Sequence, residues 1–334
     1  MTKTRWLITA LSFAVTIGVS IYMILGWSQQ GASLELPLRA HLLALLTVIV
    51  EVTARSFKIR WSAAAAGIRL SFTTAVRTSL GGDFAAAITP ARSGAEPARF
   101  FILAESGLTR SNALVVVYAE LFLEVLSLAT VVGIVALVFP HAGAVLYTLV
   151  SMVALYTSVI LGIGALALFL SRRDPNAPAP GWARSLGLKE GRWRVIQRAL
   201  QTLRSTIESV DRVRVGPAIS AFLASVLHVA IRLTVLPALV MTSVASAPVA
   251  PLALWPLGFL YGAAVIPAPG GGGAVEVAFR SALGHSIPAQ LFGAALLWWR
   301  FYTFYIYIAL GAFAAGSTVL RAVRKTENLE AQAA

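Results

Sequence analysis

Long apolar runs dominate the chain, and six of them have the length of a membrane-spanning helix. About 20 apolar residues cross the hydrocarbon core of a bilayer as one helix. The sequence therefore predicts six full spans, at 6–27, 36–54, 112–139, 144–170, 217–245 and 288–319. The first span is longer than the apolar core of a cleaved signal peptide, so we expect it to be retained.

Two further apolar stretches contain helix-breaking residues. Residues 62–103 are interrupted at 81–83 (Gly-Gly-Asp) and again at 90–96, which begins with proline. Residues 252–283 are interrupted by Pro-Ala-Pro and four glycines. Neither stretch reads as one straight helix, because proline and glycine disrupt the helical hydrogen-bond ladder. We expect each to form a broken helical hairpin.

Lysine and arginine mark one side of the membrane. They occur in the N-terminal segment, in residues 55–60, in the tail 321–334 and in the linker 171–216, where ten basic residues face four acidic ones. Neither lysine nor arginine occurs in three short connections, at 28–37, 140–143 and 246–251. Because basic loops stay in the cytoplasm, we expect both termini and the linker on the cytoplasmic side.

This orientation makes the two hairpins enter the membrane from opposite sides. The first is flanked by cytoplasmic charges and the second by external connections, and each lies between two full spans. Two such units of opposite topology occur in many transporters. The predicted fold is an all-α polytopic membrane protein with six full spans and two broken or re-entrant hairpins arranged as an inverted repeat.

The predicted division of the chain follows from this topology. Residues 1–35 form the first transmembrane helix, and 36–170 form the first repeat together with the fourth span. Residues 171–216 form a basic cytoplasmic linker, interpreted as an amphipathic segment on the anionic leaflet. Residues 217–320 form the second repeat, and 321–334 a cytoplasmic tail.

Composition supports a membrane protein and excludes an ordinary soluble enzyme. Of the 334 residues, 58% are hydrophobic and 12% are charged, about half the charged fraction of soluble domains. The net charge of +13 comes from basic residues placed between apolar runs, which argues against nucleic-acid binding. The chain contains no cysteine, so disulfides and thiol chemistry are excluded.

Twelve ionisable residues fall within the apolar stretches. Charges at membrane depth are costly, and they mark either functional sites or structural ion pairs. Both interpretations stay open for each residue taken singly. The twelve are Glu51, Asp83, Arg92, Glu96, Arg99, Glu120, Glu124, His228, Arg232, Glu276, Arg280 and Arg300.

The broken hairpins supply the candidate substrate-binding groups. Arg92, Glu96 and Arg99 share one face of a helix, if that helix already includes Arg92, and two guanidiniums suit a phosphate group. In the second hairpin, a helix that begins near Ala274 would point unpaired backbone amides at an anion. The candidates there are Pro269, Gly270, Gly271, Gly273, Glu276 and the distant Arg300. The alternative is that the glycines only permit close helix packing.

Two further pairs share helical faces. Glu120 and Glu124 lie four residues apart, as do His228 and Arg232. They are candidates for a charge relay, and the two carboxylates are candidates for counter-ions to Arg300 and Arg232. The four histidines show no metal-ligand spacing and no hydrolase motif is present, so we expect no metal, no cofactor and no catalytic residue.

The two hairpin motifs together resemble the lysylphosphatidylglycerol synthase transmembrane region family. This is the flippase-like domain that forms the membrane half of the multiple peptide resistance factor and also occurs as standalone proteins. The first motif is matched by Pro90, Arg92, Gly94, Glu96, Arg99, Gly107 and Glu120. The second is matched by Pro267, Pro269, Gly270, Gly271, Gly273 and Glu276, with Arg300 in the last span.

The sequence departs from the family pattern in places. Leu121 follows Glu120 where relatives often have arginine, and Ala95 separates Gly94 from Glu96. No soluble aminoacyl transferase domain accompanies the membrane part in this chain. The resemblance therefore implies lipid handling without lysyl transfer.

The topology and the resemblance together predict a lipid flippase or transporter of the cell (inner) membrane. Its expected substrate is an anionic phospholipid or a polyprenyl phosphate, and a homodimer is left open. The alternative is a non-catalytic accessory or scaffold subunit of a lipid, glycan or hopanoid pathway. A lipid-phosphate transferase is a third interpretation, for which the sequence offers no nucleotide site.

Overall fold

In the computed structural model the chain folds into helices. The structure describes residues 3–27, 33–89, 92–141, 143–172, 174, 177–185, 187–208, 213–263, 266 and 268–318, and none of these residues forms a strand. The expectation of an all-helical protein is therefore confirmed for the described part of the chain.

The helices follow one another with short connections. In chain order they are α1 (Lys3–Trp27), α2 (Leu38–Ala65), α3 (Phe72–Ile88), α4 (Ala95–Glu105), α5 (Arg110–Val138), α6 (Ala144–Leu170), α7 (Gly181–Ser185), α8 (Glu190–Glu208), α9 (Val215–Arg232), α10 (Val235–Met241), α11 (Val249–Gly262), the 3₁₀ turn η3 (Pro269–Gly271), α12 (Ala274–Leu283), α13 (Ala289–Arg300) and the π-helical turn η4 (Phe301–Tyr305). Residues 306–318 continue the last helix beyond η4.

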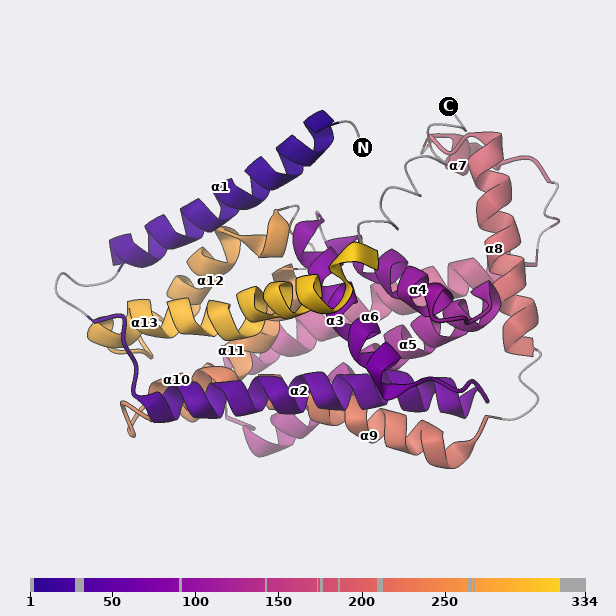
Figure 1. Cartoon of the computed structure of the whole chain (residues 1–334). Coiled ribbons are helices and arrows are strands. Elements are labelled where there is room, and N and C mark those ends of the chain that lie inside the picture. Colours follow the sequence, from indigo (N-terminus) through magenta and orange to yellow (C-terminus); the bar gives the residue numbers. More distant parts are fainter. Residues whose placement is uncertain are drawn as a thin grey trace.

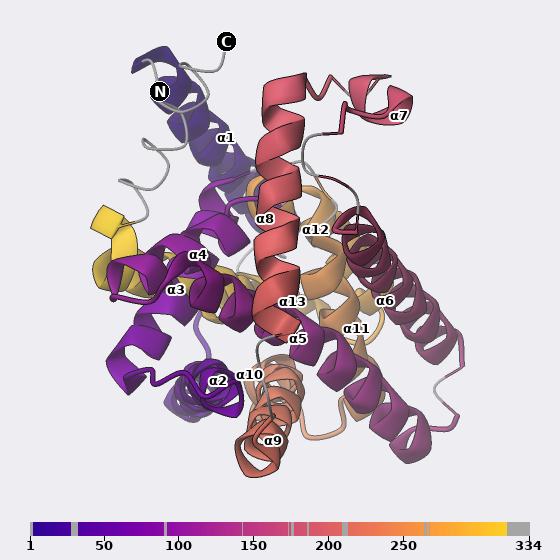
Figure 2. The same ribbon diagram turned by 90° about the vertical axis from the view of Figure 1, so that its right-hand side faces the viewer.

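Most of the long helices share one direction, and α8 crosses them. In Figure 1, α2, α9 and α13 run along the bundle, while α8 stands across the end at which α2 finishes and α9 begins. Figure 2 looks along the bundle and again shows α8 upright, where it packs against α5 and α6. A helix with this placement lies parallel to a membrane surface if the bundle spans the membrane.

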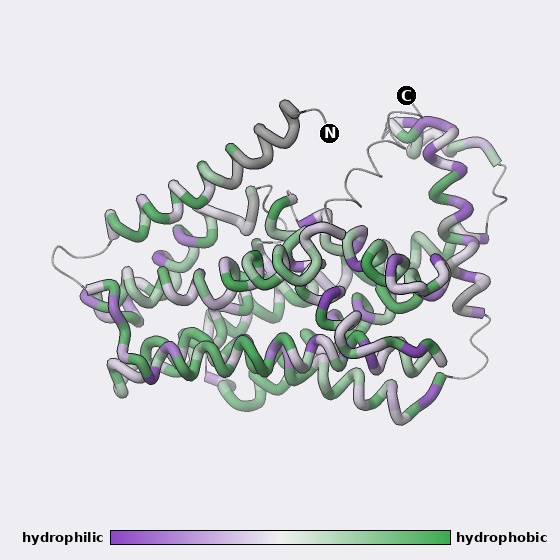
Figure 3. The backbone as a smooth tube through the Cα atoms, in the orientation of Figure 1, coloured by the Kyte–Doolittle hydropathy of each residue, from purple (hydrophilic) through white to green (hydrophobic). Residues whose placement is uncertain are grey.

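The hydropathy of the helices matches this arrangement. The tube in Figure 3 is hydrophobic along most of the bundle and much more hydrophilic along α8. On α8, Trp193 is buried against the protein while Arg192, Arg194 and Arg198 are exposed. The linker therefore contains the expected amphipathic helix, and its contact with an anionic leaflet stays a prediction.

Three helical segments are long and apolar enough to cross a membrane, by length and composition. They are Arg110–Val138, Ala144–Leu170 and Val215–Met241, of 29, 27 and 27 residues. Two shorter apolar helices, Ala14–Trp27 and Val249–Gly262, accompany them. The chain is thus a helical membrane protein, while the count of six spans and the inverted repeat stay predictions.

Two local predictions were wrong. The second span does not end at Ala54, because α2 continues for 11 further residues to Ala65. Gly-Gly-Asp at 81–83 does not interrupt the first hairpin, because α3 runs through it. The predicted span at 217–245 corresponds to the apolar segment Val215–Met241, in which a break separates α9, ending at Arg232, from α10, beginning at Val235.

The two hairpins point toward opposite ends of the bundle and touch in the middle. In Figure 1, α4 lies toward the end that carries α8, and α12 toward the other end. The turn η3, between α11 and α12, packs against α3. The break in the second hairpin thus lies beside the first hairpin.

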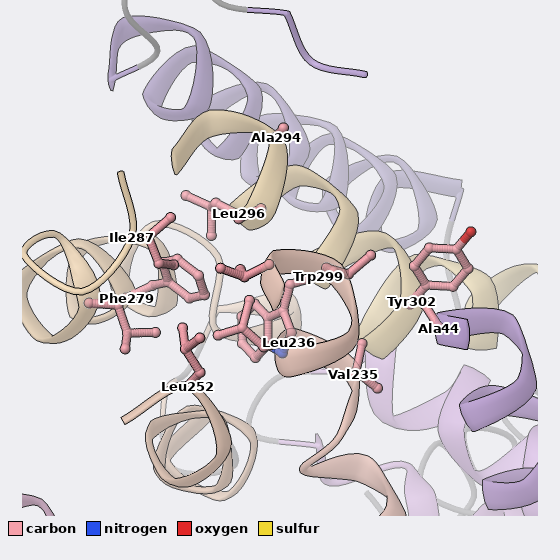
Figure 4. Close-up of a cluster of buried hydrophobic side chains, with 14 of the residues drawn as sticks. Ala44, Val235, Leu236, Leu252, Phe279, Ile287, Ala294, Leu296, Trp299 and Tyr302 are labelled. Carbon is pink, nitrogen blue, oxygen red and sulfur yellow. The ribbon is translucent and has the colours of Figure 1, made fainter. Parts of the chain in front are cut away.

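The largest apolar core holds the second half of the chain together. Phe279 of α12 and Trp299 of α13 are fully buried with ring centroids 5.2 Å apart, and they pack with Leu236 and Leu252 (Figure 4). Buried aromatic pairs of this kind contribute beyond their buried area. This core fixes α13 and so places Arg300, which follows Trp299 directly.

The last helix approaches α3 closely at Gly311. A Cβ atom at this position would collide with the backbone carbonyl oxygen of Leu80 and lie 2.7 Å from Cβ of Phe84. Near this contact, Arg77 donates hydrogen bonds to the carbonyl of Ala314 (3.2 Å) and to Thr318 (3.3 Å). Glycine is therefore required at 311 for packing rather than for a turn.

We expect G311A to destabilise the protein by about 1–2 kcal/mol. The methyl group overpacks the contact at a cost of about 1–3 kcal/mol, and the better helix propensity of alanine offsets up to about 1 kcal/mol. In G316A, where a Cβ has no described atom within 4 Å, stability should stay equal or rise. Thermal unfolding in detergent measures both variants, and a G311A protein as stable as G316A would contradict this packing.

Candidate functional site

Ten charged side chains form two ion-pair networks inside the bundle, and members of both networks line one cavity. Nine of the ten come from α2, α3, α4, α5 and α9, and Arg92 comes from the connection before α4. Each lies in contact with an opposite charge, and five are basic and five acidic. The basic ones are Arg55, Lys58, Arg92, Arg99 and Arg232; the acidic ones are Glu51, Asp83, Glu96, Glu120 and Glu124. We call this set the charged cluster.

Helix α2 supplies the centre of the charged cluster. Glu51, Arg55 and Lys58 are spaced by four and three residues, which places them on one helical face. Arg55 pairs with Asp83 of α3 through both terminal nitrogens, with Nη1 donating to Oδ1 at 2.9 Å. Its Nε also lies 3.6 Å from Oε1 of Glu51. The bidentate pair joins α2 to α3.

Lys58 joins α2 to α5. Its side chain is 0% exposed, and Nζ lies 3.2 Å from Oε1 of Glu120 and 2.6 Å from Oε2 of Glu124. Oε2 of Glu120 in turn lies 2.7 Å from Nη1 of Arg99, and Arg99 also donates to Glu96 at 3.1 Å. Opposite charges thus alternate from α2 through α5 to α4.

Glu124 also contacts polar side chains from the second half of the chain. Tyr261 of α11 donates its hydroxyl proton to Oε1 at 2.6 Å. His228 of α9 places Nε2 3.4 Å from Oε2, while its Nδ1 lies 2.9 Å from the carbonyl oxygen of Ser225. One member of each predicted helical pair, Glu124 and His228, is thus in contact. The expected counter-ion role toward Arg232 and Arg300 was wrong, because Glu120 and Glu124 pair with Lys58 and Arg99.

Arg232 forms a long-distance ion pair with Glu51. Its Nε is 3.8 Å from Oε1 of Glu51 and has no hydrogen-bond partner in the part of the chain that the structure describes. The other Glu51 oxygen accepts from the hydroxyl of Tyr307 at 2.8 Å. The guanidinium carbons of Arg55 and Arg232 lie 5.6 and 5.7 Å from the centre of the Tyr307 ring. Such cation–π contacts stabilise cations without using their N–H donors.

Arg92 is the least compensated basic residue of the charged cluster. Its Nη2 lies 4.0 Å from Oδ1 of Asp83, at the limit of an ion pair, and its side chain is 35% exposed. Its backbone has φ +57°, so it stands in the connection before α4 and not on that helix. The condition for a shared face of Arg92, Glu96 and Arg99 is not met; only Glu96 and Arg99 lie on α4.

A cavity of about 280 Å³ opens beside the charged cluster. Seven of the residues that the sequence analysis singled out line this cavity. Three come from the first hairpin and four from the two helical pairs: Arg92, Glu96 and Arg99, then Glu120, Glu124, His228 and Arg232. Arg55, Tyr156 and Tyr261 complete its polar wall. Arg92 and Arg232 also line a smaller cavity of about 40 Å³ next to it. We call the larger space the charged cavity.

The glycine-rich hairpin forms a separate polar site. Nε of Arg300 lies 2.8 Å from Oε1 of Glu276, and both terminal nitrogens donate to the carbonyl of Gly270 at 3.2 Å. Ser20 of α1 also donates to Glu276, at 2.8 Å. Arg300 thus ties the hairpin to the last helix, and it reaches only the small cavity together with Gly270.

The N-terminus of α12 is capped by its own glutamate. Helix α12 begins at Ala274 as predicted, and the amide of Gly273 donates to Oε2 of Glu276 at 2.7 Å. Gly271 donates its amide to the carbonyl of Ala268 at 3.0 Å. Two amides at the break, those of Gly271 and Gly273, are therefore engaged within the protein. The role of these amides in substrate binding stays a prediction, as does the role of Pro269, whose backbone lies in η3. Pro90 and Pro267 lie outside the described residues.

Sequence reasoning missed two central residues of the site. Arg55 and Lys58 were expected in a cytoplasmic flank, but they are buried, and only Arg60 of that group is exposed. The missed signal is their spacing from Glu51, which continues one helical face beyond the apolar run. Arg280, in contrast, lies apart from the charged cluster, 4.7 Å above the ring of Trp27.

We expect K58M to destabilise the protein by about 3–5 kcal/mol, because it leaves Glu120 and Glu124 without their shared cation. R60M is the matched control on the exposed side of α2 and should change stability by less than about 0.5 kcal/mol. Thermal unfolding in detergent compares them. Adding E120Q and E124Q to K58M should restore part of the loss. A K58M protein as stable as R60M would show that the bridge does not hold the helices together.

A comparison with known protein families covers the residues of both polar sites. The family described as lysylphosphatidylglycerol synthase TM region matches residues 9–311, which include every member of the charged cluster and of the glycine-rich site. No curated protein matches the chain. The matched family is the non-catalytic membrane part of a lipid-related protein, so the resemblance seen in the two hairpin motifs is confirmed. The chain belongs to the lysylphosphatidylglycerol synthase transmembrane region family.

Proposed function

We propose that the charged cavity binds the headgroup of an anionic or phosphate-bearing lipid and that the protein moves this lipid between leaflets. The observation that carries the proposal is the position of Arg92 and Arg232. They are the two least compensated cations of an otherwise paired cluster, and both face the charged cavity.

The presence of a cavity separates this site from a purely structural ion-pair network. Buried ion pairs that serve only packing are often no more stable than apolar residues of the same size. A space of 280 Å³ holds about nine waters at the volume of liquid water, so the charges face room for a polar guest. A packing role alone explains the charges but not the empty volume beside them.

The distribution of charge favours an anionic guest, although the cluster contains as many acidic as basic residues. Arg55, Lys58 and Arg99 each contact two carboxylates, and their charge is used within the protein. Arg92 and Arg232 each have one distant carboxylate, at 4.0 and 3.8 Å, and guanidinium groups bind phosphate oxygens in a bidentate manner. A phosphate headgroup between these two residues accepts hydrogen bonds from both.

The location of the cavity supports movement across the membrane. Its wall combines residues of the first hairpin with residues of α9 and α11 from the second half of the chain. In transporters built from inverted repeats, the site between the repeats changes access when one repeat rocks against the other. The predicted inverted repeat provides this motion here, with both termini and α8 on the cytoplasmic side of the cell membrane.

The second candidate function is an accessory or scaffold role. The contacts of the charged residues separate those expected to stabilise the fold from those expected to bind a lipid. Glu276 and Arg300 are committed to each other and to the backbone, so their neutral variants should lose folding. Variants of Arg92 and Arg232 should keep the fold. Loss of function in these folded variants favours transport over a scaffold.

We expect R92Q and R232Q each to lower lipid transport about tenfold or more, since one hydrogen bond to a charged group contributes about 1.5–3 kcal/mol. The assay follows labelled phosphatidylglycerol and a labelled polyprenyl phosphate between the leaflets of reconstituted vesicles. R60Q, on the exposed face of α2, is the matched control and should transport like the wild type.

Two results would overturn the proposal. One is a wild-type protein that moves neither labelled lipid. The other is transport by R92Q and R232Q at the wild-type rate, with unchanged elution and helicity. Either result would leave the charged cluster with a structural role alone.

A further inference from the structure

An apolar cavity of about 230 Å³ adjoins the charged cavity. It lies between α5, α6 and α11, and its wall includes Leu128, Val153 and Leu257. Almost its whole lining is hydrocarbon, whereas the charged cavity is lined by arginine and glutamate. We call this second space the apolar groove.

Two tyrosines form the boundary between the two spaces. Tyr156 of α6 and Tyr261 of α11 line both, and their rings meet edge to face with centroids 5.7 Å apart. The hydroxyl of Tyr261 donates to Glu124 on the charged side. Tyrosine suits such a boundary because its ring is apolar and its hydroxyl polar. The two spaces therefore lie on either side of this tyrosine pair, and the polarity of the lining changes there.

The apolar groove is open toward the lipid-facing surface of the bundle. Leu155 and Val159 of α6 line it and remain 68% and 49% exposed. Helix α6 is among the three segments apolar enough to span the membrane. A guest of the groove therefore reaches it sideways from the bilayer, between α6 and α11.

Glycines on α11 leave the space that the groove occupies. Gly258 and Gly262 lie four residues apart on one helical face. A Cβ atom at Gly258 would lie 3.5 Å from Leu149 and Met152, and one at Gly262 would lie 3.3 Å from Met152. A larger side chain at either position fills the groove without entering the charged cavity, because neither glycine lines that cavity.

We infer that the apolar groove holds a hydrocarbon chain of the same lipid whose anionic headgroup occupies the charged cavity. The inference rests on the proposed function and adds the chain-binding site and the entry route. An occupant that bridges both spaces must be apolar at one end and anionic at the other, because the groove offers no charge and Arg92 and Arg232 lack full compensation. The lipid enters from the bilayer between α6 and α11, with Tyr156 and Tyr261 at the junction of chain and headgroup.

Photo-crosslinking tests the chain site separately from the headgroup site. The probe is phosphatidylglycerol with a diazirine in the middle of one acyl chain, present as a trace in phosphatidylcholine nanodiscs that hold the full chain. We expect crosslinks on α6 and α11 at the groove. G258L should lower their yield about tenfold, because the leucine side chain fills the space that the acyl chain would occupy. The control is G162L, a glycine-to-leucine change on exposed α6 surface with no described atom near its Cβ.

The outcomes distinguish the proposed headgroup site from the inferred chain-binding site. Groove crosslinks that fall in G258L, in R92Q and in R232Q, but not in G162L, support the inference. Crosslinks that depend on the arginines but fall elsewhere, or that G258L leaves unchanged, overturn the chain site and leave the headgroup site intact. Crosslinking that is indifferent to R92Q and R232Q overturns the proposed function and this inference with it. Elution and helicity of each variant confirm that the fold is retained.

Discussion

A buried lysine bridge holds the arrangement on which the rest of the structure depends. Lys58 of α2 lies between Glu120 and Glu124 of α5, with no exposure to solvent. In a membrane, such a charge is tolerated only where the protein itself supplies its partner. The bridge therefore fixes the position of α2 against α5, and the ion pair of Arg55 with Asp83 adds α3 by the same rule.

The same constraint explains why uncompensated positive charge occurs at the charged cavity. Three of the five basic residues of the charged cluster contact two carboxylates each, so their charge is compensated within the packed helices. Arg92 and Arg232 differ because each has a single, distant carboxylate and faces open volume. Positive character is thus confined to the wall of one cavity, which adjoins the apolar groove.

Helical segments and breaks were largely predictable from the sequence. Apolar runs located α5 and α6 to within two residues, and the proline and glycine cluster located the start of α12. These features depend on local physics, namely hydrophobic length and the loss of backbone hydrogen bonds. The break before Val235 also has a local signal that the sequence analysis did not use, because Pro237 has no amide to bond to the carbonyl of Leu233 and its ring clashes with that carbonyl.

The site itself was predictable only in part. The charged residues inside apolar runs were recognised, because a charge at membrane depth is conspicuous. Arg55 and Lys58 were misassigned because positive residues after an apolar run are typical of cytoplasmic flanks, and only the tertiary contacts show their carboxylate partners. The role of Glu276 as the cap of its own helix follows from its spacing of three from Gly273, a spacing typical of capping interactions. Which arginines remain uncompensated depends on pairing across helices, and no local pattern encodes that.

The central claim is that Arg92 and Arg232 form an anion site in the charged cavity, beside the apolar groove. An electron cryo-microscopy structure in nanodiscs that contain an anionic phospholipid tests it most directly. The account predicts headgroup density within hydrogen-bonding distance of both guanidiniums and chain density that passes Tyr156 and Tyr261 into the groove. A structure in which both arginines turn to carboxylates of the protein, with no lipid density between them, would contradict it.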